Sequence, residues 1–209
     1  MLGHKVNKLN FILLALFSIY PLAILSGNFI INIFFLLIGS IFFFKLITKD
    51  ADFTQYKVSL YLLLFFFISL LINLFFSNDF YLSHQRVIKF FWIIFFIISF
   101  KFLMENLNQN LQNVYKIWSI IFLIVIIDIL VELLTGKNIF GQSAIMPGRI
   151  GSFTGEDSVI GNYYFGFSLI FLSYFYNLSQ KKSLNLLLAL ILIIISFLIG
   201  ERANLIRTF

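Results

Sequence analysis

Long runs of apolar residues, separated by short polar segments, extend along nearly the whole chain. The hydrocarbon core of a bilayer is about 30 Å thick, and roughly 20 helical residues cross it. Divided at that length, the apolar runs predict seven transmembrane helices near residues 9–25, 29–47, 58–76, 87–104, 114–134, 159–178 and 184–200, with an eighth beginning near Glu201. The pattern therefore predicts an all-α, polytopic transmembrane helix bundle, with residues 1–209 as a single domain.

The first apolar stretch is too long for one membrane crossing. As a single helix, residues 11–44 would extend about 50 Å at about 1.5 Å per residue. The segment Ser26-Gly27-Asn28 offers a turn that divides it. The basic N-terminus before this stretch is similar to that of a signal peptide, but no small-residue cleavage site follows, so we expect an uncleaved first helix.

Composition supports a membrane protein and excludes several other classes. Hydrophobic residues make up 61% of the chain, aromatic residues 20% and charged residues 11%, whereas soluble proteins are about 25% charged. The net charge of +6 comes from basic residues scattered at helix ends, without the basic stripe typical of a nucleic-acid-binding protein. Because the chain has no cysteine, disulfides, thiolate catalysis and Cys-ligated zinc are excluded. We expect no metal.

The basic residues predict an orientation in which the N-terminus is cytoplasmic. Most lysines then lie on the cytoplasmic side, as the positive-inside rule requires, namely Lys5, Lys8, Lys45, Lys49, Lys57, Lys101, Lys116, Lys181 and Lys182. Only Lys89 and Lys137 fall outside. The arginines are all external, with Arg86 before the fourth helix, Arg149 in the longest loop, and Arg202 and Arg207 after the seventh helix. Any one of them could extend to the interface as an anchor, but a cluster of guanidinium groups suits an anion such as a lipid diphosphate.

The longest loop, at about residues 135–158, is expected on the same external side. It is rich in glycine and contains Pro147, so it interrupts the helical pattern. Loops of this length are often functional. Gly148, Gly151 and Gly155 would allow the backbone to approach a ligand closely.

Acidic residues lie on either side of this loop. Asp128 and Glu132 in the fifth helix are four residues apart and share one helical face. A charged carboxylate inside a membrane costs about 2.5–3.5 kcal/mol on insertion scales, so this pair is a functional candidate. The structural alternative is a buried hydrogen bond or salt bridge that positions a neighbouring helix. After the loop, Asp157 or Ser158 is expected as the N-cap of the sixth helix.

Three segments follow one another in the second half of the chain. The first, IIDILVELLTGKNIFG, has an Asp-bearing helix followed by a Gly-Lys-Asn-Ile-Phe-Gly segment. The second, GRIGSFTGEDSVIGNYYFGF, has an Arg-x-Gly-x-Phe pattern, and the third, IGERANLIRTF, has a Gly-x-Arg motif. In this order the segments resemble the O-antigen ligase and O-antigen polymerase superfamily of bacterial inner-membrane proteins. These motifs correspond to Asp128 and to residues 136–141, 149–153 and 200–202.

The resemblance implies a GT-C-like glycosyltransferase of the bacterial inner membrane that uses no nucleotide, metal or other cofactor. Its substrates would be an undecaprenyl-diphosphate-linked glycan and an acceptor, either lipid A-core for a ligase or a growing polysaccharide for a polymerase. The residues implied in diphosphate binding are Arg149 and Arg202, joined through their placement by Arg86 and Arg207, with Asp128, Glu132 and Glu201 as supporting polar groups.

The chain is expected to be incomplete, and two rival classes of function remain, a transporter and a scaffold. Family members are about twice as long as this chain. In ligases, the histidine expected to act on the acceptor hydroxyl lies in a later loop, after the part of the family sequence that this chain resembles. We therefore expect an incomplete chain that is inactive alone and contains no catalytic residue. A membrane transporter or flippase of a lipid-linked or anionic substrate is the second functional class, and a noncatalytic scaffold would make the arginines replaceable.

Overall fold

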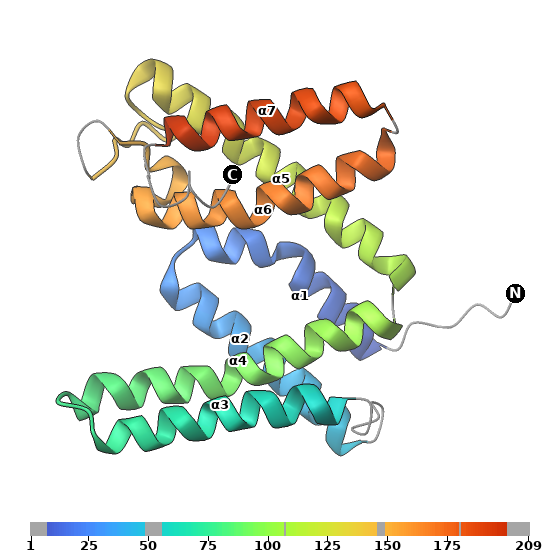
Figure 1. Cartoon of the computed structure of the whole chain (residues 1–209), viewed down its shortest axis with the longest axis vertical. Coiled ribbons are helices and arrows are strands. Elements are labelled where there is room, and N and C mark those ends of the chain that lie inside the picture. The colour runs from blue at the N-terminus through green and yellow to red at the C-terminus, as the bar shows by residue number, and fades with distance from the viewer. Residues whose placement is uncertain (1–7, 49–55, 107, 146–148, 180, 200–209) are drawn as a thin grey trace, which may run out of the picture. The chain divides into compact units, whose positions relative to one another are not determined.

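The computed structural model describes residues 8–48, 56–106, 108–145, 149–179 and 181–199, and within these ranges the chain is helical with no strand. The helices are α1 (Lys8–Leu25), α2 (Asn28–Ile47), α3 (Lys57–Phe75), α4 (Phe80–Asn106), α5 (Asn108–Thr135), α6 (Asp157–Leu178) and α7 (Lys182–Leu198), with a short 3-10 helix, η2 (Ser152–Thr154), between α5 and α6 (Figure 1). The all-helical fold is confirmed. Five helices, α1 to α5, are long and apolar enough to cross a membrane. A crossing by α6 or α7 stays a prediction.

The predicted break in the first apolar stretch is confirmed. α1 ends at Leu25 and α2 begins at Asn28. Between them Gly27 has a φ of +99°, in the left-handed region that glycine adopts without steric cost. The Ser26 hydroxyl donates a hydrogen bond of 2.8 Å to the Leu22 carbonyl, which satisfies one of the carbonyl groups at the end of α1.

The start of α4 differs from the prediction, because the helix begins at Phe80 and not at residue 87. Asp79 caps this end: its carboxyl group accepts a hydrogen bond of 3.1 Å from the Leu82 N–H, and its carbonyl accepts one of 3.1 Å from the Ser83 N–H. Capping satisfies N–H groups that a helix end otherwise leaves without partners. The polar segment after Phe80 is therefore helical, and the expectation that Arg86 precedes the helix is wrong.

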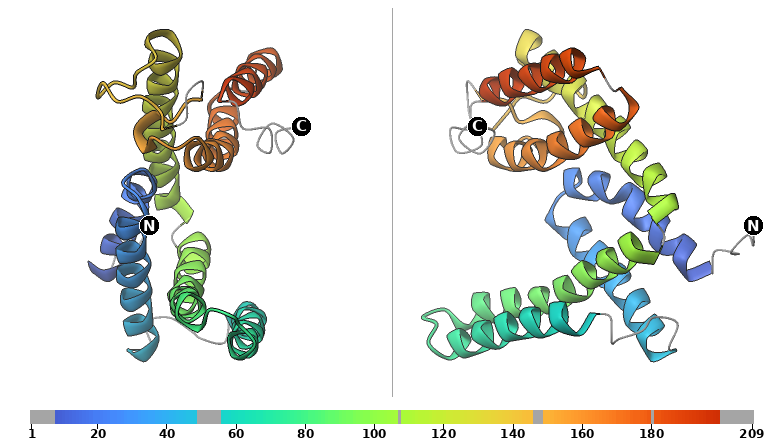
Figure 2. Two further views of the ribbon diagram at one scale, coloured as in Figure 1. Left: turned by 90° about the vertical axis from the view of Figure 1, so that its left-hand side faces the viewer. Right: turned by 45° about the vertical axis from the view of Figure 1, so that its right-hand side comes forward.

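The described chain forms two compact units. The first comprises residues 1–17 and 29–111, and thus the first half of α1, nearly all of α2, and α3 and α4. In it α3 and α4 run antiparallel and side by side (Figures 1 and 2). Aromatic contacts fill its interior, such as those of Phe96 with Phe17 and Phe35, whose ring centroids lie 5.2 and 4.9 Å away.

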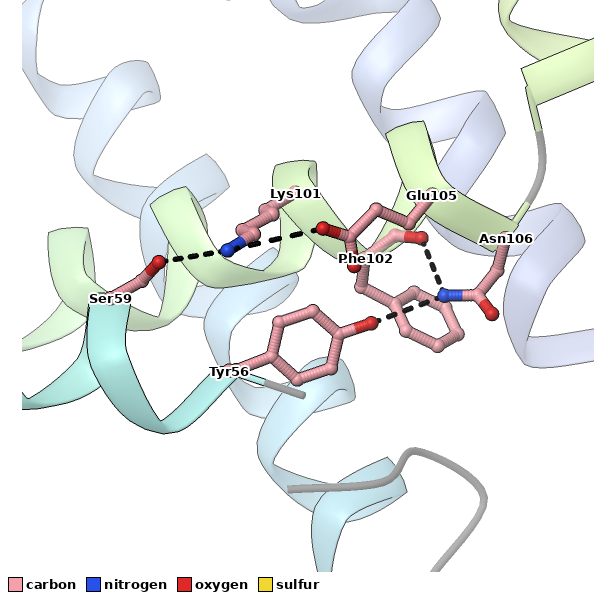
Figure 3. Close-up of polar contacts among 6 residues, drawn as sticks. All are labelled: Tyr56, Ser59, Lys101, Phe102, Glu105 and Asn106. Atoms are coloured by element: carbon pink, nitrogen blue, oxygen red, sulfur yellow. Dashed lines mark hydrogen bonds and ion pairs between the residues drawn. The ribbon is translucent and has the colours of Figure 1, made fainter. Parts of the chain in front are cut away.

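Polar side chains tie the start of α3 to the end of α4 (Figure 3). The Lys101 ammonium donates a hydrogen bond of 2.9 Å to the Ser59 hydroxyl and lies 3.9 Å from the Glu105 carboxyl group. One turn further along α4, the Asn106 amide donates a hydrogen bond of 3.1 Å to the hydroxyl of the buried Tyr56. These contacts fix the two helices to each other at the end opposite their connecting turn.

Lys45, which the charge pattern assigns to the cytoplasmic end of α2, is buried within the same unit at 1% exposure. Its ammonium group donates a hydrogen bond of 2.6 Å to the Asn10 side-chain oxygen. It also lies 4.9 Å from the centre of the Phe102 ring, a cation–π distance. This lysine therefore links three helices and does not extend into solvent.

The second unit comprises residues 18–28 and 112–209, and so contains most of α5, the loop with η2, α6 and α7. α6 and α7 form an antiparallel hairpin (Figure 1). The hydroxyl of buried Tyr164 on α6 donates a hydrogen bond of 2.8 Å to the Leu192 carbonyl on α7. On the α5 side, the ring of Phe122 packs against Tyr164 and Phe171, with centroids 5.2 and 5.6 Å away. α6 thus contacts α7 through this hydrogen bond and α5 through the aromatic rings.

Candidate functional site

The loop after α5 begins with two tight turns. Gly136, with a φ of +73°, ends the helix by donating its N–H to the Glu132 carbonyl at 2.8 Å, the arrangement of an αL cap. Asn138 then organises a turn: its carbonyl accepts the Gly141 N–H, and its N–H donates to the Gln142 carbonyl, each at 2.8 Å. Its side-chain oxygen accepts the Gln142 N–H, also at 2.8 Å. The Gly-Lys-Asn-Ile-Phe-Gly segment is thus a compact turn directly beyond the helix.

The second half of the loop packs against its own backbone. The Ile145 N–H donates a hydrogen bond of 3.0 Å to the Gly155 carbonyl. A Cβ atom added at buried Gly151 would lie 2.5 Å from the carbonyl carbon of Gly155, closer than real Cβ atoms come. Gly151 therefore permits a close approach of the loop to its own backbone at Gly155. An approach of this backbone to a ligand stays a prediction. Gly148 lies outside the described residues.

Two buried carboxyl groups of α5 hold this loop. Asp128 is 0% exposed and accepts hydrogen bonds of 2.7 Å from the Ile139 N–H and 2.5 Å from the Ser152 hydroxyl. Glu132, one turn later and 4% exposed, accepts hydrogen bonds from two successive N–H groups, those of Gly151 at 3.3 Å and Ser152 at 2.6 Å. Both carboxyl groups are thus directed into the loop.

Ser152 is the centre of this arrangement. Its φ of +48° is in the left-handed region that residues other than glycine rarely adopt, and hydrogen bonds from its N–H and hydroxyl to the two carboxyl groups hold it there. Its carbonyl accepts the Asn138 side-chain amide at 3.0 Å, which joins the two halves of the loop. The sequence left open that Asp128 and Glu132 form buried hydrogen bonds that position a neighbouring helix. They do form buried hydrogen bonds, but these bonds position the loop and not a helix.

The expected N-cap of α6 is wrong. The helix begins at Asp157, so Glu156 occupies the N-cap position, with a φ of −115° and a ψ of 124°, and Asp157 and Ser158 lie within the helix. The Thr154 hydroxyl donates a hydrogen bond of 2.9 Å to the Glu156 carbonyl, which also accepts the Ile160 N–H at 3.1 Å. Because Glu156 is extended and its carbonyl already accepts a helical hydrogen bond, the helix starts two residues before the predicted boundary.

Of the other residues implicated by the sequence, two are described and three are not. Arg149 is exposed on the loop, next to the segment that the carboxyl groups hold, in the second unit. Arg86 is exposed on α4 in the first unit. Glu201, Arg202 and Arg207 lie outside the described residues. Within the described part of the second unit, the structure thus brings Asp128 and Glu132 to the loop that carries Arg149.

Asn138 and Ser152 are part of the site although the sequence does not single out their side chains. Both are short polar residues within glycine-rich segments, and such residues are common in ordinary turns. They lie 14 residues apart in a loop, where no helical or strand periodicity links two positions. The only available signal is their position inside two of the family-like motifs.

The second unit also has a cavity of about 770 Å³, lined in part by Asn113 and Lys116 of α5 and by Tyr174 and Asn177 of α6. Lys116 precedes Glu132 by 16 residues, which is about 24 Å along a helix. This cavity is therefore at the other end of α5 from the loop. The hydrogen bonds of the two buried carboxyl groups lie at the loop.

The candidate site is thus a glycine-rich loop that buried carboxyl groups hold against the end of α5, and that presents an exposed arginine. The chain matches no protein-family model, no curated protein sequence and no solved structure.

Proposed function

We propose that this chain takes part in the assembly of bacterial surface polysaccharide, as an inner-membrane protein of the glycosyltransferase type. The reaction transfers a glycan from an undecaprenyl-diphosphate carrier to lipid A-core or to a growing polysaccharide at the periplasmic face. In this proposal the loop after α5 binds the diphosphate through Arg149.

The observation that carries the proposal is the division of roles within the Arg-x-Gly-x-Phe motif. Ile150 is buried, Gly151 fills a position with no room for a side chain, and Ser152 bonds to both carboxyl groups. The Phe153 ring packs on another phenylalanine of the loop, with centroids 5.4 Å apart. Arg149 is the exposed residue of the motif. The other four residues pack and form hydrogen bonds within the loop, and they hold the backbone next to Arg149 in position.

A supported arginine suits a diphosphate for two reasons. Its planar guanidinium group donates two parallel hydrogen bonds to phosphate oxygens, which a lysine ammonium cannot do. Hydrogen bonds fix the adjacent backbone before any ligand binds, so less conformational freedom is lost on binding. As the bond between glycan and diphosphate breaks, negative charge increases on the diphosphate, and a guanidinium group already in place stabilises it.

Binding of undecaprenyl diphosphate to the purified protein in detergent tests this role. We expect Arg149→Gln to weaken binding by about tenfold or more, since about 1.4 kcal/mol corresponds to a factor of ten, and Arg149→Lys to retain only part of the affinity. Lys137→Gln is the matched control, because it removes one charge from an exposed residue of the same loop. Unchanged affinity in Arg149→Gln would contradict the proposal.

A second measurement addresses transfer in the cell. In the bacterium that encodes this chain, Arg149→Lys in the chromosomal gene should reduce surface polysaccharide while the amount of protein in the membrane stays normal. A noncatalytic scaffold predicts no reduction. A flippase predicts that the lipid-linked glycan accumulates, unchanged, on the cytoplasmic side, whereas failed transfer leaves it on the periplasmic side.

A further inference from the structure

The first unit contains a groove between α3 and α4, of about 360 Å³, that is polar at one end and apolar at the other. The polar end, near the turn that joins the helices, is formed by Asn73 and Ser77 of α3 and by Ser83 and Arg86 of α4. The two serine hydroxyls lie 2.5 Å apart and form a hydrogen bond across the turn. The hydrogen-bonding groups of the two serines are thus partly used in holding the helices together. Arg86 and Asn73 line the groove beside them.

The polar end has a net positive charge. No acidic residue lines the groove. The nearby carboxyl group of Asp79 is used in capping α4, where it accepts the Leu82 N–H. Within the described parts of the chain, the guanidinium group of Arg86 makes no hydrogen bond or ion pair. A guanidinium group in this situation is available to an anion.

The rest of the groove is apolar and continues from the charged end. Leu70 and Leu74 of α3 face Val87, Phe90 and Ile93 of α4. On each helix these residues are three or four positions apart, so they form one continuous stripe along the groove. From Arg86 to Ile93 the axial distance is about 10 Å at about 1.5 Å per residue. A positive end and an apolar stripe in one line match the two parts of a lipid.

We propose that this groove binds an anionic lipid, with Arg86 holding the phosphate of the headgroup and the side-chain amide of Asn73 donating to it. The hydrocarbon chain lies along the stripe that includes Leu74 and Phe90. This inference goes beyond the proposed function, because it depends on the first unit alone and requires neither glycan transfer nor Arg149. It differs from simple anchoring, in which an arginine extends to the interface without selecting a headgroup.

The test is photocrosslinking of the protein in dodecyl maltoside with a phosphatidic acid that carries a diazirine in one acyl chain. We expect crosslinked peptides from residues 70–77 and 83–93. Unlabelled phosphatidic acid should compete. Diacylglycerol with the same chains should not, because it lacks the phosphate, and inorganic phosphate should not, because it lacks the chains. Competition by diacylglycerol or by inorganic phosphate that equals that of phosphatidic acid would overturn the proposal, as would crosslinks confined to other peptides.

Charge variants identify the headgroup contact. Arg86→Gln should lower the apparent affinity by about tenfold, or about 1.4 kcal/mol, and Arg86→Lys by less. Lys89→Gln removes the same charge from an exposed residue of α4 that does not line the groove, and it should change the affinity by less than about twofold. Equal losses in Arg86→Gln and Lys89→Gln would show diffuse attraction and overturn the site.

Two further variants keep the result independent of folding and of the proposed function. Leu70→Trp narrows the apolar part of the groove while Arg86 stays in place, so crosslinking should fall although the thermal midpoint stays unchanged. Normal crosslinking in this variant would contradict the position of the hydrocarbon chain. Arg149→Gln should leave crosslinking to α3 and α4 unchanged, so failure of the loop to bind diphosphate and failure of the groove to bind lipid are separate outcomes.

Discussion

A carboxyl group that accepts hydrogen bonds from two successive backbone N–H groups cannot be replaced by an amide without a loss. Glu132 is in this position, since each of its oxygens accepts one N–H, from Gly151 and from Ser152. In a glutamine one of the two acceptors becomes an NH₂ group, which meets an N–H donor. A buried donor that loses its partner costs about 1–3 kcal/mol.

We therefore expect Glu132→Gln to lower the stability of the protein by about 1–3 kcal/mol and to increase hydrogen exchange at residues 150–153. Glu105→Gln is the matched control, because this half-exposed carboxyl group forms an ion pair at 3.9 Å with Lys101, and exposed pairs contribute about 0–1 kcal/mol. Thermal midpoints in detergent and amide exchange of the loop measure both effects. Equal behaviour of the two variants would contradict the role of Glu132 as the loop's anchor.

Among the elements, the helices were predictable because local signals define them. Apolar runs place their centres, and Gly27 marks the turn between α1 and α2. The start of α4 was missed because a polar segment weakens the apolar pattern there, while the decisive signal, the Asp79 cap, is one side chain. The loop was predictable in position only. Its conformation depends on contacts such as that between Asp128 and Ser152, which are 24 residues apart and which no local spacing indicates.

Glycine substitutions distinguish the loop from the helices. Gly151→Ala should destabilise the loop by about 1–3 kcal/mol, because the new methyl group would lie 2.5 Å from the backbone of Gly155. Gly166→Ala in α6 adds the same group where no atom lies within 4 Å. Alanine is a better helix former than glycine by about 0.5–1 kcal/mol, so this change should be neutral or stabilising. Thermal midpoints check the pair, and a loss in Gly166→Ala with none in Gly151→Ala would reverse the assignment.

For the molecule as a whole, the exposed apolar side chains of the helices indicate the environment that surrounds the protein. In the first unit these include Phe29, Phe65 and Phe75, the last at 81% exposure, and in the second unit Ile127 at 54% and Leu134 at 83%. Large exposed apolar surfaces occur in proteins that contact membranes. Side chains of this size and number on helices long enough to cross a bilayer are consistent with insertion into one.

The orientation can be measured directly, because the chain has no cysteine and every single-cysteine variant has one label site. With a cytoplasmic N-terminus and seven crossings, Asn78→Cys and Gln142→Cys should react in intact cells with a maleimide that cannot cross the membrane. Ser183→Cys should react only after the cells are opened. All three residues are exposed. Labelling of Ser183→Cys but not Gln142→Cys in intact cells would reverse the orientation and place the loop in the cytoplasm.

If α5 crosses the membrane as predicted, its attachment to the loop makes the position of the loop depend on the bilayer. Asp128 and Glu132 tie the loop to the last two turns of a helix that is 28 residues long. Long transmembrane helices respond to a thinner bilayer by tilting. Because the hydrogen bonds fix the loop to the helix, a tilt of α5 would move Arg149 together with the end of the helix. The lipid composition would then change the distance between the guanidinium group and the lipid headgroups.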